Sequence, residues 1–278
     1  MIDIFLVIDI IQLIYKVPSM LLMMLSICTI IKEIKNKNIN FNTQFYIIIV
    51  CKLTNEIVYI MTIFIFIKLP KWGFCNDFLE NNGWMATIHF TLLAQETTFM
   101  FLITLLISIN RYIAVKYPLS YKFYFSKSRT LLTLLSFIIL SVIIGLGNIL
   151  FNAKYVRVDL FDYIVPSFKS KNEIYYQLFY RIFLLGIISV ATCTFNVMAI
   201  LTLKKHNQNV NKYKKELFYI IYSVFIFITL IFVETYFVCR LISLKYEIKL
   251  LSNITNFFHV VAFDLTSVGD FYFLLYSW

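Results

Sequence analysis

The stretch "FMFLITLLISINRYIAVKYPLSYK", residues 99–122, decides how this chain folds. It closes a run that is almost wholly apolar from Trp84 onward, and the run stops at Asn110, Arg111 and Tyr112. An apolar run longer than about 18 residues indicates a helix that crosses a membrane. Pro118 follows seven residues after Arg111 and disfavours helix at the residue before it. We therefore predict a membrane span that ends near Arg111, where the arginine head reaches the interface.

The composition extends this prediction to the whole chain. Of the 278 residues, 60% are hydrophobic and only 14% are charged, whereas a soluble domain has about a quarter charged residues. Six glycines and four prolines are too few for a β-rich or disordered protein. We expect an all-α, polytopic membrane protein that forms a single seven-transmembrane domain over residues 1–278. The seven predicted spans are residues 10–31, 43–67, 84–109, 130–150, 176–203, 217–241 and 255–277.

Lysine and arginine in the connectors predict the orientation. The first, third and fifth connectors hold thirteen basic residues, and the second, fourth and sixth hold nine. Cytoplasmic loops carry an excess of these residues, so the first set is predicted to lie in the cytoplasm and the N-terminus outside. The formal charge of +10 is explained by these loops, which favour anionic lipid and give no reason to expect nucleic acid binding.

Several functional classes lack their characteristic residues. The five cysteines are scattered without CxxC spacing, so we expect no metal site and no cofactor. No pairing of a nucleophile with a base and no phosphate-binding loop is evident, so we do not expect an enzyme. The N-terminus has no basic leader, and no cleavable signal peptide is evident.

Three stretches carry a resemblance to a known family. Residues 99–122, "KLPKWGF" (68–74) and "FDLTSVGDFYFLL" (263–275) resemble nematode serpentine chemoreceptors, which belong to the rhodopsin-like superfamily of G-protein-coupled receptors. The gamma/V branch of these receptors is the most similar. The resemblance implies a multi-pass protein of the plasma membrane, in sensory cilia, that detects an external small molecule and activates a heterotrimeric G protein.

The same resemblance implies roles for residues at the cytoplasmic end of the third span. Asn110, Arg111 and Tyr112 stand where the family has Asp-Arg-Tyr, and Pro118 stands where a proline follows in the second intracellular loop. In that family the arginine switches between an intramolecular partner and the G protein. Glu216 lies near the position of an acid that can hold this arginine, so we predict an Arg111–Glu216 contact. The alternative is two solvated charges at the interface.

The sequence departs from the wider superfamily in ways that bear on coupling. Asn110 replaces the usual acid. The usual cysteine at the top of the third span is missing, and residues 151–175 contain no cysteine, so the usual disulfide cannot form. The sequence also ends at Trp278, where family members continue with a cytoplasmic tail. Either the sequence is part of a longer product, or coupling that depends on a tail is absent.

Ionisable residues inside spans are costly and are therefore candidates for function. Lys52 and Glu56 lie four residues apart on one helical face and are predicted to neutralise each other. Other polar and aromatic residues are predicted to come to similar depths in the outer half and to line a ligand cavity. These are His89, Phe90, Gln95, Glu96, Arg181, Glu234, His259 and Asp264. Two alternatives remain for them: interhelical pairing, such as Arg181 with Glu234, or a proton or ion pathway.

The predicted function is a chemosensory G-protein-coupled receptor. The alternative from another class is a small transporter or a ligand-gated ion channel, because insect-type chemoreceptors also have seven spans. Those channels place the N-terminus inside, so topology separates the two hypotheses.

Overall fold

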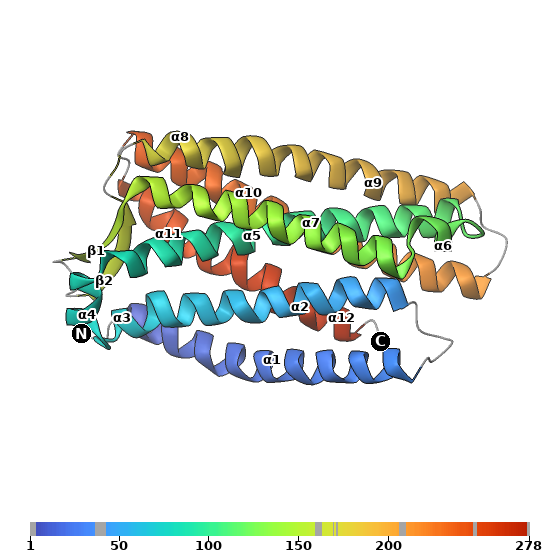
Figure 1. The fold of residues 1–278 in the computed structure, drawn as a ribbon, viewed down its shortest axis with the longest axis horizontal. Coiled ribbons are helices and arrows are strands. Elements are labelled where there is room, and N and C mark those ends of the chain that lie inside the picture. Colours follow the sequence, from blue (N-terminus) through green and yellow to red (C-terminus); the bar gives the residue numbers. More distant parts are fainter. Residues whose placement is uncertain are drawn as a thin grey trace. The chain divides into compact units, whose positions relative to one another are not determined.

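The computed structural model describes residues 4–36, 43–158, 163–168, 170, 172–205, 210–246 and 249–276. In the described residues, long helices alternate with short helices, 3-10 and π segments (η), turns and a β-hairpin (Figure 1). The long helices are α1 (Ile4–Lys35), α2 (Thr43–Ile63), α5 (Gly83–Lys116), α7 (Lys127–Leu146), α9 (Leu185–Lys205), α10 (Val210–Tyr246) and α11 (Lys249–Asp264). The shorter segments are η1 (Phe64–Lys68), α3 (Leu69–Lys71), α4 (Asn76–Asn81), α6 (Tyr121–Tyr124), η2 (Gly147–Phe151), β1 (Ala153–Val158), β2 (Tyr163–Phe168), α8 (Glu173–Gln177), η3 (Leu178–Leu184), η4 (Leu265–Gly269) and α12 (Asp270–Tyr276).

Within the described residues, six helical stretches are long and apolar enough to cross a membrane. They are Val7–Lys35, Gln44–Lys71, Gly83–Lys116, Lys127–Phe151, Glu173–Lys205 and Ile220–Ser243. Many of their apolar side chains are exposed, for example Ile14 at 70% and Val190 at 69%. Such surfaces suit a lipid environment, where only helices and closed barrels satisfy their backbone groups. The chain is therefore an all-α polytopic membrane protein.

The last predicted span coincides with a continuous helical stretch. α11, η4 and α12 follow one another without a break from Lys249 to Tyr276. This stretch is longer than the roughly 20 residues that a transmembrane helix requires. Several of its side chains lie outside the described residues, so the seventh span stays a prediction.

The chain divides into two compact units, and three long helices, α2, α5 and α7, contribute to both. Unit 1 comprises Met1–Phe41, Val50–Phe99 and Ile138–Glu173. Unit 2 comprises Asn42–Ile49, Met100–Phe137 and Ile174–Trp278. Each unit has its own packing and its own set of candidate residues.

Unit 1 contains a β-hairpin that the all-α prediction did not include. β1 and β2 pair antiparallel, with Val156 opposite Val165. The hairpin lies at the same end of unit 1 as α3 and α4 (Figure 1). Its buried residues Ala153, Tyr155 and Ile164 pack with Leu79 of α4 and Ala86 of α5. The Tyr155 hydroxyl donates to the carbonyl oxygen of Phe66 at 3.1 Å, and burial raises the pKa of this phenol.

The hairpin is anchored without a disulfide. The five cysteines are free, and none of them belongs to the hairpin. The apolar cluster around Tyr155 and Ile164 supplies the anchoring instead, because burial of side chains of this size stabilises by about 1.5–3 kcal/mol each.

In unit 2, α10 packs against α9 and α11. The last turns of α5 form the end that we predict to face the cytoplasm. There Val115 packs with Ala199 and Leu203 of α9 and with Ile220 of α10. Further along α10, the ring of Phe225 stacks on Phe273 of α12, with centroids 4.6 Å apart. These contacts join the end of α5 to α9 and α10, and join α10 to α12.

Candidate functional site

The Asn-Arg-Tyr triplet lies inside helix α5, not at its end. α5 continues to Lys116, beyond residue 109, where the predicted span ends. Tyr117 is the first residue outside the helix, as expected from the proline that follows it. Because the helix continues past the triplet, the helical backbone sets the direction in which each of these three side chains points.

Arg111 is buried, which corrects the expectation that its head reaches the interface. Its residue is only 2% exposed, and the guanidinium carbon lies 3.7 Å from the centre of the Phe45 ring of α2. A guanidinium over an aromatic face is stabilised by about 2 kcal/mol when water is excluded. The aromatic ring therefore offsets part of the cost of burying this charge.

Asn110 is tied to the loop that follows α5. Its side-chain amide donates to the hydroxyl of Tyr121 at 2.7 Å, and Asn110 has no exposed surface. Tyr121 belongs to α6, and its ring stacks on Phe125 with centroids 5.6 Å apart. Asn110, which replaces the family's acid, thus holds Tyr121 and its loop against α5. We predict that this loop is the second intracellular loop.

Tyr112 is half-buried and joins the cluster formed by Val115, Ala199, Leu203 and Ile220. Its hydroxyl accepts a hydrogen bond from the ammonium of Lys116 at 2.5 Å. Its ring also lies near Phe195 of α9, with a centroid distance of 5.8 Å. The position of Tyr112 is thus set by α9 and α10.

The predicted acidic partner of Arg111 cannot be placed. Glu216 lies in helix α10, but its side chain is outside the described residues. The Arg111–Glu216 contact therefore stays a prediction.

A buried polar chain next to the triplet was missed by sequence reasoning. The hydroxyl of Ser223 in α10 donates to the Asn196 carbonyl oxygen in α9 at 2.6 Å. It also lies 3.0 Å from the hydroxyl of Ser108, one helical turn before Arg111. Single serine and asparagine residues in apolar spans were the available signal, because such polar groups hydrogen-bond across helices in membranes.

The candidate ligand residues of unit 1 contact α2, η1 and the hairpin. The buried His89 ring lies between Phe66 and Phe90, with centroid distances of 5.8 and 5.2 Å. The Phe90 ring stacks on Phe168 of β2 at 3.9 Å. Phe90 therefore packs against the hairpin, and His89 lies next to Phe90.

Glu96 and Gln95 lie deeper in α5. Oε1 of Glu96 accepts from the Thr62 hydroxyl at 2.6 Å, and its main-chain oxygen accepts from Asn55 at 3.1 Å. Glu96 is 2% exposed, and within the described residues its Oε2 has no hydrogen-bond partner. Gln95 is half-buried and lies against Gly145 of α7. These contacts tie α5 to both neighbours in unit 1.

In unit 2, the contacts of Arg181 differ from the pairing with Glu234 that was the alternative from the sequence. Arg181 donates to Tyr180 at 2.8 Å and to Gln177 at 3.2 Å, and its guanidinium carbon lies 4.6 Å from the centre of the Phe237 ring. Among the described residues, Arg181 forms no ion pair with Glu234. Glu234 is half-buried beside Gly186.

Two further candidates, His259 and Asp264, belong to α11. Asp264 is half-buried at the end of α11. His259 is in α11 as well, but its side chain is outside the described residues. His89, Phe90, Gln95 and Glu96 belong to unit 1, and Arg181, Glu234, His259 and Asp264 belong to unit 2.

The predicted Lys52–Glu56 pair is confirmed. The Lys52 ammonium and a carboxylate oxygen of Glu56 form an ion pair within α2, and the two side chains are only 2% and 3% exposed. The i, i+4 spacing places both on one helical face, so each charge neutralises the other inside the span.

Comparison with known proteins gives the family. No curated protein matches the chain. The family model described as Srg family chemoreceptor matches residues 9–277, which is nearly the whole chain. This agrees with the six apolar helices and with the resemblance carried by the three stretches quoted above. The chain belongs to the Srg family of serpentine chemoreceptors.

Proposed function

We propose that this protein is a chemosensory receptor that detects an external small molecule and activates a cytoplasmic heterotrimeric G protein. In this proposal the chain crosses the plasma membrane seven times, with its N-terminus outside. Membership of a chemoreceptor family supports the sensory role. The buried Arg111 in α5 carries the proposal for coupling, because this is the arginine that the resemblance assigns to the G protein.

In this proposal the described geometry is the resting state. Arg111 lies against Phe45 and is only 2% exposed, so the arginine is not presented to a partner. In the active state Arg111 leaves Phe45 and reaches the G protein. A ligand that binds this second state more tightly shifts the population towards it.

The contacts around α10 identify what has to move. Ser108, Asn196 and Ser223 join α5, α9 and α10 by hydrogen bonds, and the Val115 cluster packs the same three helices. Displacement of α10 would break both sets and open the space next to Arg111. The basic residues of the adjacent loops, such as Lys122 and Lys127, would then face an acidic surface of the partner.

Ligand contact is assigned to the eight candidate residues of the two units. In unit 1 these are His89, Phe90, Gln95 and Glu96, and in unit 2 they are Arg181, Glu234, His259 and Asp264. Glu96 is the strongest of them, because a buried carboxylate with one oxygen lacking a described partner has capacity for another hydrogen bond.

The proposal is tested by nucleotide exchange on added heterotrimeric G proteins, using membranes that contain the chain. We expect exchange above that of empty membranes, and we expect Arg111→Ala to reduce it to the level of empty membranes. Lys32→Ala is the matched control, because it removes an exposed positive charge from α1, outside the loops assigned to the partner, and should leave exchange within about twofold. Exchange that is absent, or equal in the intact chain and Arg111→Ala, would contradict coupling through Arg111 and favour the channel or transporter hypothesis.

A further inference from the structure

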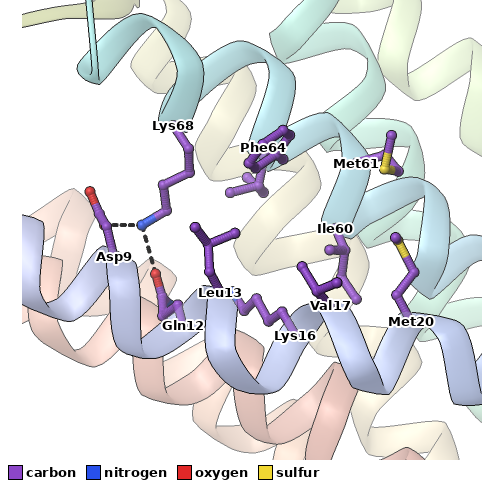
Figure 2. Close-up of a pocket in the computed structure, with 11 residues that line it drawn as sticks. Asp9, Gln12, Leu13, Lys16, Val17, Met20, Ile60, Met61, Phe64 and Lys68 are labelled. Atoms are coloured by element: carbon purple, nitrogen blue, oxygen red, sulfur yellow. Dashed lines mark hydrogen bonds and ion pairs between the residues drawn. The ribbon is translucent and has the colours of Figure 1, made fainter.

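Unit 1 contains a cavity of about 160 Å³ between α1 and the segment formed by α2 and η1 (Figure 2). Apolar side chains from both sides form its walls, among them Leu13, Val17 and Met20 of α1, and Ile60, Met61 and Phe64 of α2 and η1. The α1 residues are spaced by four and three, which places them on one face of the helix. An apolar cavity of this size stays free of water and holds a molecule about as large as benzene.

The polar groups at one end of the cavity are occupied by one another. Asp9 of α1 accepts from the ammonium groups of Lys68 and Lys71, the latter at 2.7 Å, and Lys68 also donates to Gln12 at 2.6 Å. Figure 2 shows Lys68 reaching across from η1 to Asp9 and Gln12. Lys16 lines the same cavity one turn further along α1 and has a partner of its own. These charges are therefore engaged within the protein and do not select a charged ligand.

The lining instead discriminates against charged ligands. A charged or strongly polar group in the cavity would lose its water without gaining a hydrogen-bond partner, which makes its burial unfavourable. A neutral apolar molecule has no such loss, and its own surface is removed from water. Met20 and Met61 belong to the lining, and flexible thioether side chains adapt to the outline of an apolar ligand.

The cavity is accessible from the bilayer side of unit 1. Val17 and Met61 line it and are 45% and 40% exposed, and both lie in helical stretches apolar enough to cross a membrane. From Leu13 to Met20 the α1 wall is about 10 Å long, at about 1.5 Å per residue. An extended lipid chain covers half of the hydrocarbon core, about 15 Å. The cavity therefore suits a compact molecule better than a lipid chain.

We propose that this cavity binds a neutral, compact apolar molecule, such as a monocyclic hydrocarbon, which enters from the bilayer. The site contains none of the eight candidate residues to which ligand contact is assigned above, so it is an additional ligand site. It is also separate from the coupling proposal, because binding is measured at the cavity itself and needs no G protein.

The experiment uses the full chain with isotope-labelled methionine methyl groups in phosphatidylcholine nanodiscs, titrated with benzene and followed by methyl NMR. Met20 and Met61 line the cavity, whereas Met24 of α1 is 41% exposed and lies outside the lining. We expect the Met20 and Met61 signals to shift and saturate, and the Met24 signal to change only in proportion to the benzene in the bilayer. Met20→Leu and Met61→Leu assign the two signals. Benzoate and benzylammonium, which are charged, should cause no saturable shift.

A variant that fills the cavity provides a second test. Leu13→Trp should reduce the saturable Met61 shift at least about fivefold, because the larger side chain takes the space of the ligand. Met61 reports this change from the opposite wall, away from the substituted helix. Leu21→Trp is the matched control, because this α1 residue is 54% exposed and lies outside the lining. The control should respond to benzene as the parent chain does.

Several results would overturn the proposal. Met20 and Met61 shifts that grow linearly and match that of Met24 would mean partition into the bilayer. A saturable Met61 shift that persists in Leu13→Trp would mean that benzene binds elsewhere. An equal response to benzoate would mean that the lining does not discriminate against charge. Saturable shifts in short-chain detergent micelles that are absent in the nanodiscs would show that a lipid chain is the occupant.

Discussion

At the residue scale, the side chain that matters most is an arginine resting on an aromatic ring. Arg111 lies over Phe45 at 3.7 Å and is almost completely buried. A guanidinium over an aromatic face adds an attraction that is lost when the ring is removed.

Replacement of Phe45 by leucine tests this contact. Loss of about 1–2 kcal/mol of stabilisation of the resting state should raise basal nucleotide exchange about fivefold to thirtyfold. Phe101→Leu is the matched control, because Phe101 is equally buried and belongs to α5. If both variants leave basal exchange unchanged, or both raise it equally, the Phe45 ring does not hold the resting state.

The ion pair within α2 gives a second prediction. Glu56→Gln leaves the Lys52 charge buried, which should lower the free energy of unfolding by about 3–5 kcal/mol. Replacing both Lys52 and Glu56 by methionine should cost much less, because no buried charge remains. Reversible unfolding in mixed detergent micelles measures both variants. An equal loss in the single and double variants would show that the charges are not coupled.

The difference between these two contacts explains what sequence reasoning could predict at this scale. The Lys52–Glu56 pair is local, and helical periodicity alone predicts it. Phe45, which contacts Arg111, and Tyr121, which contacts Asn110, belong to other elements than α5. In a chain with many aromatic residues, the sequence alone does not indicate which of them these two side chains contact. Arg111 and Asn110 were identified from the resemblance, but their partners depend on tertiary packing.

At the element scale, close helix packing depends on a glycine in unit 1. A Cβ atom at Gly145 of α7 would lie 2.6 Å from the main-chain oxygen of Thr91 in α5. Small residues allow this approach in membrane proteins, where helices associate largely by close packing. α5 and α7 therefore have no room for a larger residue at this position.

Gly145→Ala should force the two helices apart and lower the free energy of unfolding by about 1–3 kcal/mol. Gly186→Ala is the matched control, since its Cβ would lie 3.7 Å from a carboxylate oxygen of Glu234, an ordinary contact. The control should be neutral or slightly stabilising, because alanine has a higher helix propensity than glycine. The same unfolding assay compares them, and a tolerated alanine at position 145 would contradict the close approach.

The elements themselves were predicted unevenly. The first six predicted spans coincide with apolar helices, because twenty apolar residues in sequence have few other structures available. The β1–β2 hairpin was missed, although "AKYVRV" alternates in the way a half-buried strand does. The π segments η1, η3 and η4 have no reliable sequence pattern, since they differ from α-helix by a single extra residue per turn.

At the scale of the whole molecule, the apolar composition predicts a polytopic membrane protein. The orientation is predicted from the distribution of basic residues between the loops. Thirteen basic residues in one set of loops against nine in the other favour an external N-terminus. The mechanism depends on this orientation, because Arg111 meets a G protein only if the end of α5 that carries it faces the cytoplasm. A channel of the insect chemoreceptor type would have the opposite orientation.

The most direct test is therefore the side on which each end of α5 lies in intact cells. Cysteines introduced at exposed positions, Ser120 beside α6 and Asn152 before the hairpin, would be labelled with a membrane-impermeant maleimide, in a background without the native cysteines. We predict that position 152 and an N-terminal epitope react from outside, and that position 120 reacts only after permeabilisation. Labelling of position 120 from outside, with the N-terminus protected, would contradict the receptor mechanism.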